Sequence, residues 1–146
     1  GRIRNMRVSK VVSKVSAIKE VRDKLVKQQV QMGEDKGVVM DGRDIGTVVF
    51  PNAELKLFMT ADTQVRAERR YEELRSKGQE ISIEKVRQNL EERDLIDTTR
   101  AESPLLRAED AIIIDNSQLN LAQQLNYTVL LAKAEIFNLN NSDLLE

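Results

Sequence analysis

The sequence predicts an α/β fold in which a parallel sheet is flanked by helices. Three short apolar runs, at residues 37–41, 55–59 and 111–115, have the composition of buried strands. Longer segments with apolar residues at every third or fourth position separate these runs, as is typical of amphipathic helices. Two of the runs end in an aspartate, Asp41 and Asp115. Because open α/β sheets bind ligands outside the carboxyl ends of their strands, these polar ends are candidate sites.

The composition indicates one globular domain and excludes several kinds of chemistry. The 146 residues are 40% hydrophobic and 32% charged with a net charge of −1, so neither a nucleic acid nor a membrane is an expected partner. There is no cysteine and no histidine, which excludes disulfides, zinc sites built on these residues and histidine triads. We therefore expect no metal site in the chain. No membrane span or signal peptide is visible, and a cytoplasmic location is expected.

The first half of the chain is expected to form one long helix, a strand and a loop. Residues 6–32 carry valine, isoleucine and leucine at helical spacing. Their β-branched side chains lower helix propensity, so packing would have to hold this helix. The strand at 37–41 follows, and residues 42–53 are expected to be a loop with a turn at Pro51-Asn52.

The second half is expected to contain two strands and three helices. We place them at residues 55–59, 62–77, 83–100, 111–115 and 118–137.

Capping residues and charge density refine this assignment. Thr60 or Asp62 is expected to cap the first of these helices, and Asn116 or Ser117 the last. The helices within 62–104 are highly charged and have thin apolar stripes, which favours a flap that stands off the core. Residues 138–143 are expected to be frayed.

The first candidate site is the turn Asp41-Gly42-Arg43-Asp44, which lies between two apolar runs and is followed by Gly46. An arginine fork at the end of a strand can bind a phosphate while a neighbouring aspartate orients it. The alternative is a surface turn with its own local ion pair.

A second candidate site lies on the helix expected at 83–100. Arg93, Asp97 and Arg100 are spaced four and three residues apart, so they share one helix face. Two guanidinium groups around a carboxylate could hold a phosphate and a sugar hydroxyl together. The alternative is a solvated ladder of salt bridges that contributes little.

A third candidate site is formed by Arg66, Arg69 and Arg70 near the start of the preceding helix. Such a group could neutralise the charge of a polyphosphate during phosphoryl transfer. The alternative is an exposed charged face, which nearby glutamates balance.

Several motifs together resemble those of bacterial cytidylate kinases, which are P-loop nucleoside monophosphate kinases. The matching segments are Asp41–Pro51, Leu55–Met59, Arg66–Arg70, Glu92–Arg100, Ser103–Leu105 and Ala108–Asp115. The resemblance extends over roughly residues 3–135. It implies a partial P-loop kinase fold with a helical lid, and transfer of the γ-phosphoryl group of ATP to CMP or dCMP with Mg²⁺. The intact enzyme is expected to be a monomer.

The resemblance also implies roles for individual residues. The turn from Asp41 to Asp44 would form the floor of the monophosphate pocket, with Arg43 on the CMP phosphate and Arg100 as a further phosphate ligand. The remaining roles are cytosine reading for Ser13, Arg22 and Asp44, ribose binding for Arg93 and Asp97, and lid-side phosphate contacts for Arg66, Arg69 and Arg70. A carboxylate such as Asp44 accepts from the amine of cytosine and repels the oxygen that uracil has there.

One departure from the family is the lack of a G-x-x-x-x-G-K-[ST] phosphate loop. We therefore expect the carboxyl-terminal part of one kinase domain. Residues 1–33 would complete the monophosphate-binding region and its following helix, 37–61 the core strands, 62–104 the lid, and 108–137 the last strand and helix. Alone, this part is expected to be inactive, to bind neither ATP nor Mg²⁺, and to self-associate through exposed apolar surface. The alternatives are a non-catalytic nucleotide-binding or interaction module, and a helical scaffold whose arginines only solvate its surface.

Overall fold

The computed structural model describes residues 6–142, which form an α/β arrangement of helices around a small parallel sheet. The elements in chain order are α1 (Met6–Ser16), α2 (Lys19–Met32), the π-helix η2 (Ile45–Val49), β1 (Leu57–Thr60), α3 (Thr63–Ser76), α4 (Ile83–Thr99), β2 (Ile112–Asp115) and α5 (Leu121–Ser142).

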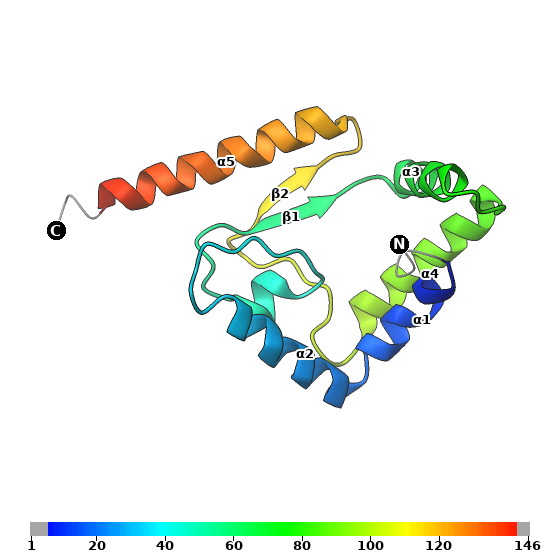
Figure 1. The fold of residues 1–146 in the computed structure, drawn as a ribbon, viewed down its shortest axis with the longest axis horizontal. Helices are drawn as coiled ribbons and strands as arrows, with labels where there is room; N and C mark the ends of the chain where they lie inside the picture. The colour runs from blue at the N-terminus through cyan, green and yellow to red at the C-terminus, as the bar shows by residue number, and fades with distance from the viewer. Residues whose placement is uncertain (1–5, 143–146) are drawn as a thin grey trace.

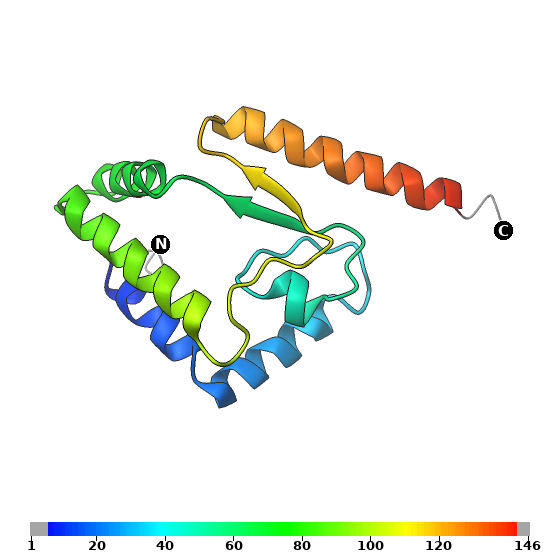
Figure 2. The same cartoon turned by 180° about the vertical axis from the view of Figure 1, so that it is seen from behind.

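The sheet consists of β1 and β2, which pair in parallel with Leu57 opposite Ile112 and Thr60 opposite Asp115. Helices α1, α3 and α4 lie together on one side of the sheet, α2 and η2 lie below it, and α5 projects away from the other side (Figures 1 and 2). The α/β class and the parallel pairing of the second and third expected strands are confirmed.

The tightest apolar packing lies between the two charged helices. Ala67 and Leu74 of α3 and Val86 of α4 are almost completely buried. Helix α4 also packs against α1. Thin apolar stripes therefore suffice for α3 and α4, because each helix buries its stripe against its neighbour rather than against the sheet.

The expectation of one helix over residues 6–32 is wrong. Helix α1 ends at Ser16, and Ile18 has an extended conformation with φ −73° and ψ 124° before α2 begins. The hydroxyl of Ser16 donates to the carbonyl of Ser13 at 3.1 Å, a local bond that competes with helix continuation. The β-branched residues before the break give little local support for continuing the helix. The resulting corner turns α2 across the end of α1.

The strand expected at residues 37–41 does not form among the described residues. Val39 is fully exposed and Val38 is 42% exposed, so this apolar run has no sheet partner to cover it. A strand requires a neighbour for its backbone groups, and β1 pairs only with β2 within residues 6–142. The loop expected at 42–53 contains the π-helix η2, a conformation that is rare and often occurs at functional sites.

The helix caps are partly as expected. Asp62 caps α3, since its Oδ1 accepts from the backbone N–H of Gln64 at 2.8 Å. The cap of α5 is neither Asn116 nor Ser117. It is Asn120, whose side chain and that of Gln123 accept from each other's backbone N–H at 2.9 Å in a capping box.

The segment expected to fray after residue 138 is helical as far as Ser142, and residue 143 lies outside the described residues.

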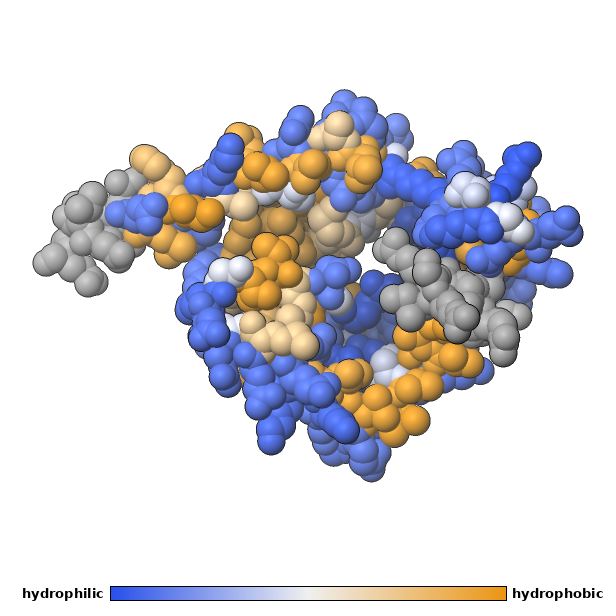
Figure 3. Space-filling view, in the orientation of Figure 1, coloured by the Kyte–Doolittle hydropathy of each residue, from blue (hydrophilic) through white to orange (hydrophobic). Residues whose placement is uncertain are grey.

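Helix α5 and the sheet leave a large apolar surface uncovered. Leu121, Leu130 and Phe137 are 81%, 66% and 68% exposed, and Ile113 of β2 is 51% exposed. Figure 3 shows apolar residues along α5 and over the adjoining sheet. The expectation of a buried strand at residues 111–115 therefore holds only for Ile114 of β2, which is 2% exposed in the described chain. Within residues 6–142, no helix has the length and apolar character needed to span a membrane.

Candidate functional site

A cleft of about 240 Å³ lies where α1, α2, α4 and the turn before η2 meet. Seven of the eight residues expected to bind substrate line it: Ser13, Arg22, Arg43, Asp44, Arg93, Asp97 and Arg100. Asp41 is the exception, because it is exposed and is not among the lining residues. The fold therefore brings together side chains from four segments that are far apart in the sequence.

The turn that carries Asp44 is fixed by its contact with α2. A Cβ atom on Gly33, at the end of α2, would lie 2.4 Å from Cε1 of Phe50, so the phenyl ring occupies the space that a larger residue would need. The carbonyl of Asp44 accepts the backbone N–H of Val49 at 3.3 Å, and this bond between residues five apart begins the π-helix. This anchoring holds the side chain of Asp44 toward α2 and the cleft.

Arg22 and Asp44 form a buried ion pair at the floor of the cleft. Their side chains are only 9% and 2% exposed, and Nη2 of Arg22 donates to Oδ2 of Asp44. Removing either partner would leave an uncompensated buried charge. The partner of Asp44 lies on α2, and Arg43 pairs with Asp97 on α4. The alternative for this turn, a surface turn whose charges pair only with each other, is therefore wrong.

The charged face of α4 is buried where it meets the cleft. Oδ2 of Asp97 accepts from Nε of Arg43 at 3.0 Å, and its Oδ1 lies 3.8 Å from Nη1 of Arg100. Asp97 is 2% exposed and Arg100 9%. The guanidinium of Arg100 is held by the carbonyl of Ser103, a residue with a positive φ of 49°. The alternative for this helix face, a solvated ladder of salt bridges, is therefore wrong because Asp97 and Arg100 are buried.

The cleft carries an excess of positive charge. Arg22, Arg43, Arg93 and Arg100 face only Asp44 and Asp97 there, which leaves a formal charge of +2. Burial lowers the pKa of Arg93, and the nearby guanidinium of Arg43 lowers it further. Burial and then Arg22 likewise lower the pKa of Arg100. Arginine remains charged at neutral pH, so the cleft suits an anion.

Three buried polar atoms of the lining residues have no hydrogen-bond partner in the described chain. They are Nε of Arg22, Nε of Arg93 and Oε1 of Gln29. Buried polar groups are normally paired, so such atoms mark places where a ligand can bind. Gln29 was not among the expected site residues. It lies seven positions after Arg22, on the same face of α2, but polar residues at this spacing also occur on ordinary solvated helix faces, so spacing alone does not indicate it.

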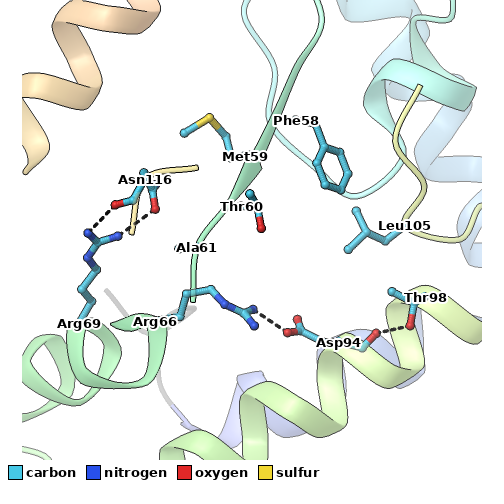
Figure 4. Close-up of a pocket in the computed structure, with 10 residues that line it drawn as sticks. All are labelled: Phe58, Met59, Thr60, Ala61, Arg66, Arg69, Asp94, Thr98, Leu105 and Asn116. Atoms are coloured by element: carbon cyan, nitrogen blue, oxygen red, sulfur yellow. Dashed lines mark hydrogen bonds and ion pairs between the residues drawn. The ribbon is translucent and has the colours of Figure 1, made fainter. Parts of the chain in front are cut away.

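A second cleft, of about 350 Å³, opens at the carboxyl end of β1 (Figure 4). Arg66 and Arg69 line it and Arg70 does not. Nη1 of Arg66 lies 2.5 Å from Oδ2 of Asp94 on α4. The guanidinium of Arg69 donates to the side chain of Asn116 at 2.9 Å and to its carbonyl at 2.8 Å.

The three lid-side arginines therefore differ in what they contact. Nη1 of Arg70 donates to Glu73 on the same helix at 2.5 Å. This contact agrees with the alternative of a charged face that nearby glutamates balance. Arg66 and Arg69 instead connect α3 to α4 and to the loop after β2. In the part of the chain that the structure describes, no group of three or more acidic side chains is arranged to hold a metal ion.

Comparison with known proteins agrees with the motifs and the cleft. A family model described as cytidylate kinase matches residues 1–134. The chain is 62% identical over 122 residues to a cytidylate kinase of Phocaeicola vulgatus, an alignment that covers 84% of this chain and 53% of that protein. A cytidylate kinase of Flavobacterium psychrophilum is 60% identical over 122 residues, covering 84% of this chain and 54% of its own length. One of Porphyromonas gingivalis is 54% identical over 123 residues, covering 84% and 53%.

The chain spans about half the length of the curated relatives it matches. The family model covers most of this chain, and each of these relatives is identical to it at more than half of the aligned positions. The chain belongs to the cytidylate kinase family.

Proposed function

We propose that this chain supplies the nucleoside monophosphate site and the lid of a cytidylate kinase, which transfers the γ-phosphoryl group of ATP to CMP or dCMP. The observation that carries this proposal is the cleft with a formal charge of +2, where Arg22 and Arg100 are buried. A phosphate monoester carries about −1.5 to −2 at pH 7, so the charges of the cleft and of a nucleoside monophosphate are complementary. The orphaned Nε atoms of Arg22 and Arg93 provide donors for such a ligand.

The base is proposed to lie against Ser13, Arg22 and Asp44, which are all buried at the cleft floor. Oδ2 of Asp44 is engaged by Arg22, while its Oδ1 has no hydrogen bond to the described residues. That oxygen can accept from the exocyclic amine of cytosine, and it would face the oxygen of uracil unfavourably. This asymmetry is the physical basis proposed for preferring CMP to UMP.

The sugar and phosphate are proposed to lie toward the arginines of α4 and of the turn before η2. Arg43 and Arg100 would hold the phosphate, while Arg93 and Asp97 would hold the ribose. Asp97 already orients both phosphate-binding arginines, because it lies within 4 Å of each guanidinium. Positioning and charge neutralisation of this kind account for most of the catalysis of phosphoryl transfer.

ATP and Mg²⁺ are proposed for the complete kinase. Arg66 and Arg69 line the second cleft and fit an anionic ligand there, but the chain has no phosphate-loop sequence for the β- and γ-phosphates. Mg²⁺ would be held mainly by phosphate oxygens and water, since the described residues offer no cluster of three acids. We therefore propose that the 146-residue chain alone does not turn over ATP.

The base-reading proposal is tested with Asp44→Asn in a full-length cytidylate kinase that carries this sequence. We expect the ratio of kcat/KM for CMP to that for UMP to fall at least about tenfold, because the amide can also donate to uracil. Asp35→Asn, on an exposed loop outside both clefts, is the matched control. An unchanged ratio in Asp44→Asn would refute the assignment.

A second candidate function is nucleotide binding without catalysis. It is favoured by the fact that seven of the eight residues expected to bind substrate line the first cleft. Calorimetry with CMP on the 146-residue chain distinguishes the two, since tight binding by the isolated chain would support a stand-alone binding module. The helical scaffold is the weakest alternative, because Arg22, Asp97 and Arg100 are buried at the cleft rather than solvated.

We also propose that the complete kinase is a cytoplasmic monomer, whereas the isolated chain self-associates. The exposed apolar side chains of α5 and β2, such as Ile113 and Phe137, support the second statement. Sedimentation of the chain at several concentrations tests it, and a monomer at all of them would contradict it.

A further inference from the structure

Helix α1 presents a face of serines to the arginines of α4. Ser9, Ser13 and Ser16 are spaced four and three residues apart, which places them on one side of the helix. Ser9 and Ser13 are 6% and 4% exposed, so this face is buried in the junction with α4. Small neutral hydroxyl groups therefore occupy the side of α1 that adjoins the cleft.

A buried hydrogen-bond chain crosses this junction from Asn89 through Ser9 to Arg93. The hydroxyl of Ser9 donates to Oδ1 of Asn89 at 2.6 Å, and its oxygen accepts from Nη1 of Arg93 at 3.3 Å. A serine hydroxyl has a single hydrogen, so donating it to Asn89 leaves the lone pairs free to face the guanidinium. Asn89 is 7% exposed and lines neither cleft.

Arg93 differs from the other arginines of the cleft in its partners. Arg22 pairs with Asp44, whereas Arg43 and Arg100 lie within 4 Å of a carboxylate oxygen of Asp97. No ion pair of the described residues includes Arg93, and its Nε is buried without a partner. The contact that holds it there is the neutral hydroxyl of Ser9.

A neutral partner and a carboxylate have different consequences for binding an anion. A carboxylate would form the stronger contact, but it would also neutralise the guanidinium and compete with an anionic ligand for its donors. A hydroxyl that is itself held by an amide restricts the guanidinium without reducing its charge. The guanidinium then needs less reorganisation when a ligand binds.

We propose that Ser9 and Asn89 are positioning residues, which hold Arg93 in the cleft and leave its charge available to the sugar–phosphate end of a nucleoside monophosphate. Neither residue belongs to the motifs that indicate the family. The inference rests on the proposed function, because it takes the cleft to be the nucleotide site.

The experiment measures CMP binding by calorimetry in a full-length cytidylate kinase that carries this sequence. Ser9→Ala removes the hydroxyl, and Asn89→Leu removes the acceptor that directs it while keeping the number and branching of the side chain's heavy atoms. Each is expected to raise the Kd for CMP about three- to tenfold, the effect of one lost hydrogen bond. Gln88→Leu, a similar change on the exposed face of α4, is the matched control and is expected to leave the Kd unchanged.

The discriminating measurement repeats both substitutions in an Arg93→Ala background. If Ser9 and Asn89 act through Arg93, neither substitution changes the Kd further in that background. A loss of affinity by the same factor in both backgrounds would show a merely structural role and overturn the inference. The inference would also be overturned if Ser9→Ala and Asn89→Leu left the Kd for CMP at its wild-type value. A wild-type enzyme that does not bind CMP would instead overturn the proposed function, and this inference with it.

Discussion

Replacing Asp44 by alanine should destabilise the isolated chain strongly, with or without nucleotide. The substitution removes the carboxylate that compensates Arg22 at the floor of the cleft. Both side chains are nearly inaccessible, at 2% and 9% exposure, so water can hardly replace the lost partner. The guanidinium would remain buried and charged, with its Nε already lacking a partner in the described chain.

The expected magnitude follows from this burial. Breaking a buried ion pair by removing one partner typically costs about 3–5 kcal/mol, most of which reflects the uncompensated charge that remains. Lys19 and Asp23 form an ion pair of similar chemistry whose side chains are 60% and 63% exposed. Because exposed pairs contribute little, Asp23→Ala should leave stability nearly unchanged. The double variant Arg22→Met with Asp44→Leu should recover most of the loss, since no buried charge is left.

Urea unfolding followed by circular dichroism measures these differences as shifts in midpoint at constant slope. We expect the urea midpoint to be highest for the wild type, lower for the double variant and lowest for Asp44→Ala, with Asp23→Ala close to the wild type. An Asp44→Ala chain as stable as the Asp23→Ala control would refute the claim that the cleft floor is a dry ion pair.

Two further predictions concern Glu73 and Gly33. A hydrogen bond from Lys77, followed by one from a neighbouring arginine, lowers the pKa of Glu73 from 4.5 to about 2. The ionised Glu73 therefore stabilises the fold above pH 4.5, and this contribution is lost as the pH falls toward 2. In urea titrations, Glu73→Gln should be less stable than the wild type at pH 6 and equally stable near pH 2. Gly33→Ala should cost about 1–3 kcal/mol in the same assay, because its Cβ would lie 2.4 Å from the ring of Phe50. The control Gly46→Ala should change little, since its nearest contact, at 3.4 Å, is a flexible lysine side chain, and equal losses in the two variants would contradict this account.

The sequence predicted those elements whose signals are local. Asp62, one of the two residues expected to cap α3, is its cap, and the predicted bounds of α3 and α4 differ from the observed bounds by at most one residue at each end. The strand at 37–41 was the main failure, because its apolar composition is that of a buried strand while pairing depends on a neighbour that the described residues do not provide. The break before Ile18 was missed because helical spacing continues across it and only tertiary packing sets the direction of α2.

The candidate site was predictable as a set of residues but not as an arrangement. Motif resemblance indicated Arg43, Asp44, Arg93, Asp97 and Arg100, and the fold brings all five into one cleft. Neither the unpaired amide oxygen on α2 nor the serine face of α1 could be recognised from spacing as part of a site. Both depend on which side of a helix the neighbouring elements cover.

The sequence by itself determined the kind of protein and the chemistry open to it. The lack of cysteine and histidine leaves carboxylates, arginine, lysine, hydroxyls and the backbone for its chemistry, and the arginine and aspartate motifs place it in its family. Only the tertiary structure decided which charges are buried, which are paired, and that Arg93 alone among the cleft arginines has no carboxylate partner in the described chain. The physical reason is that the energy of a charge depends on its solvent exposure and its neighbours, and both are set by segments distant in the chain.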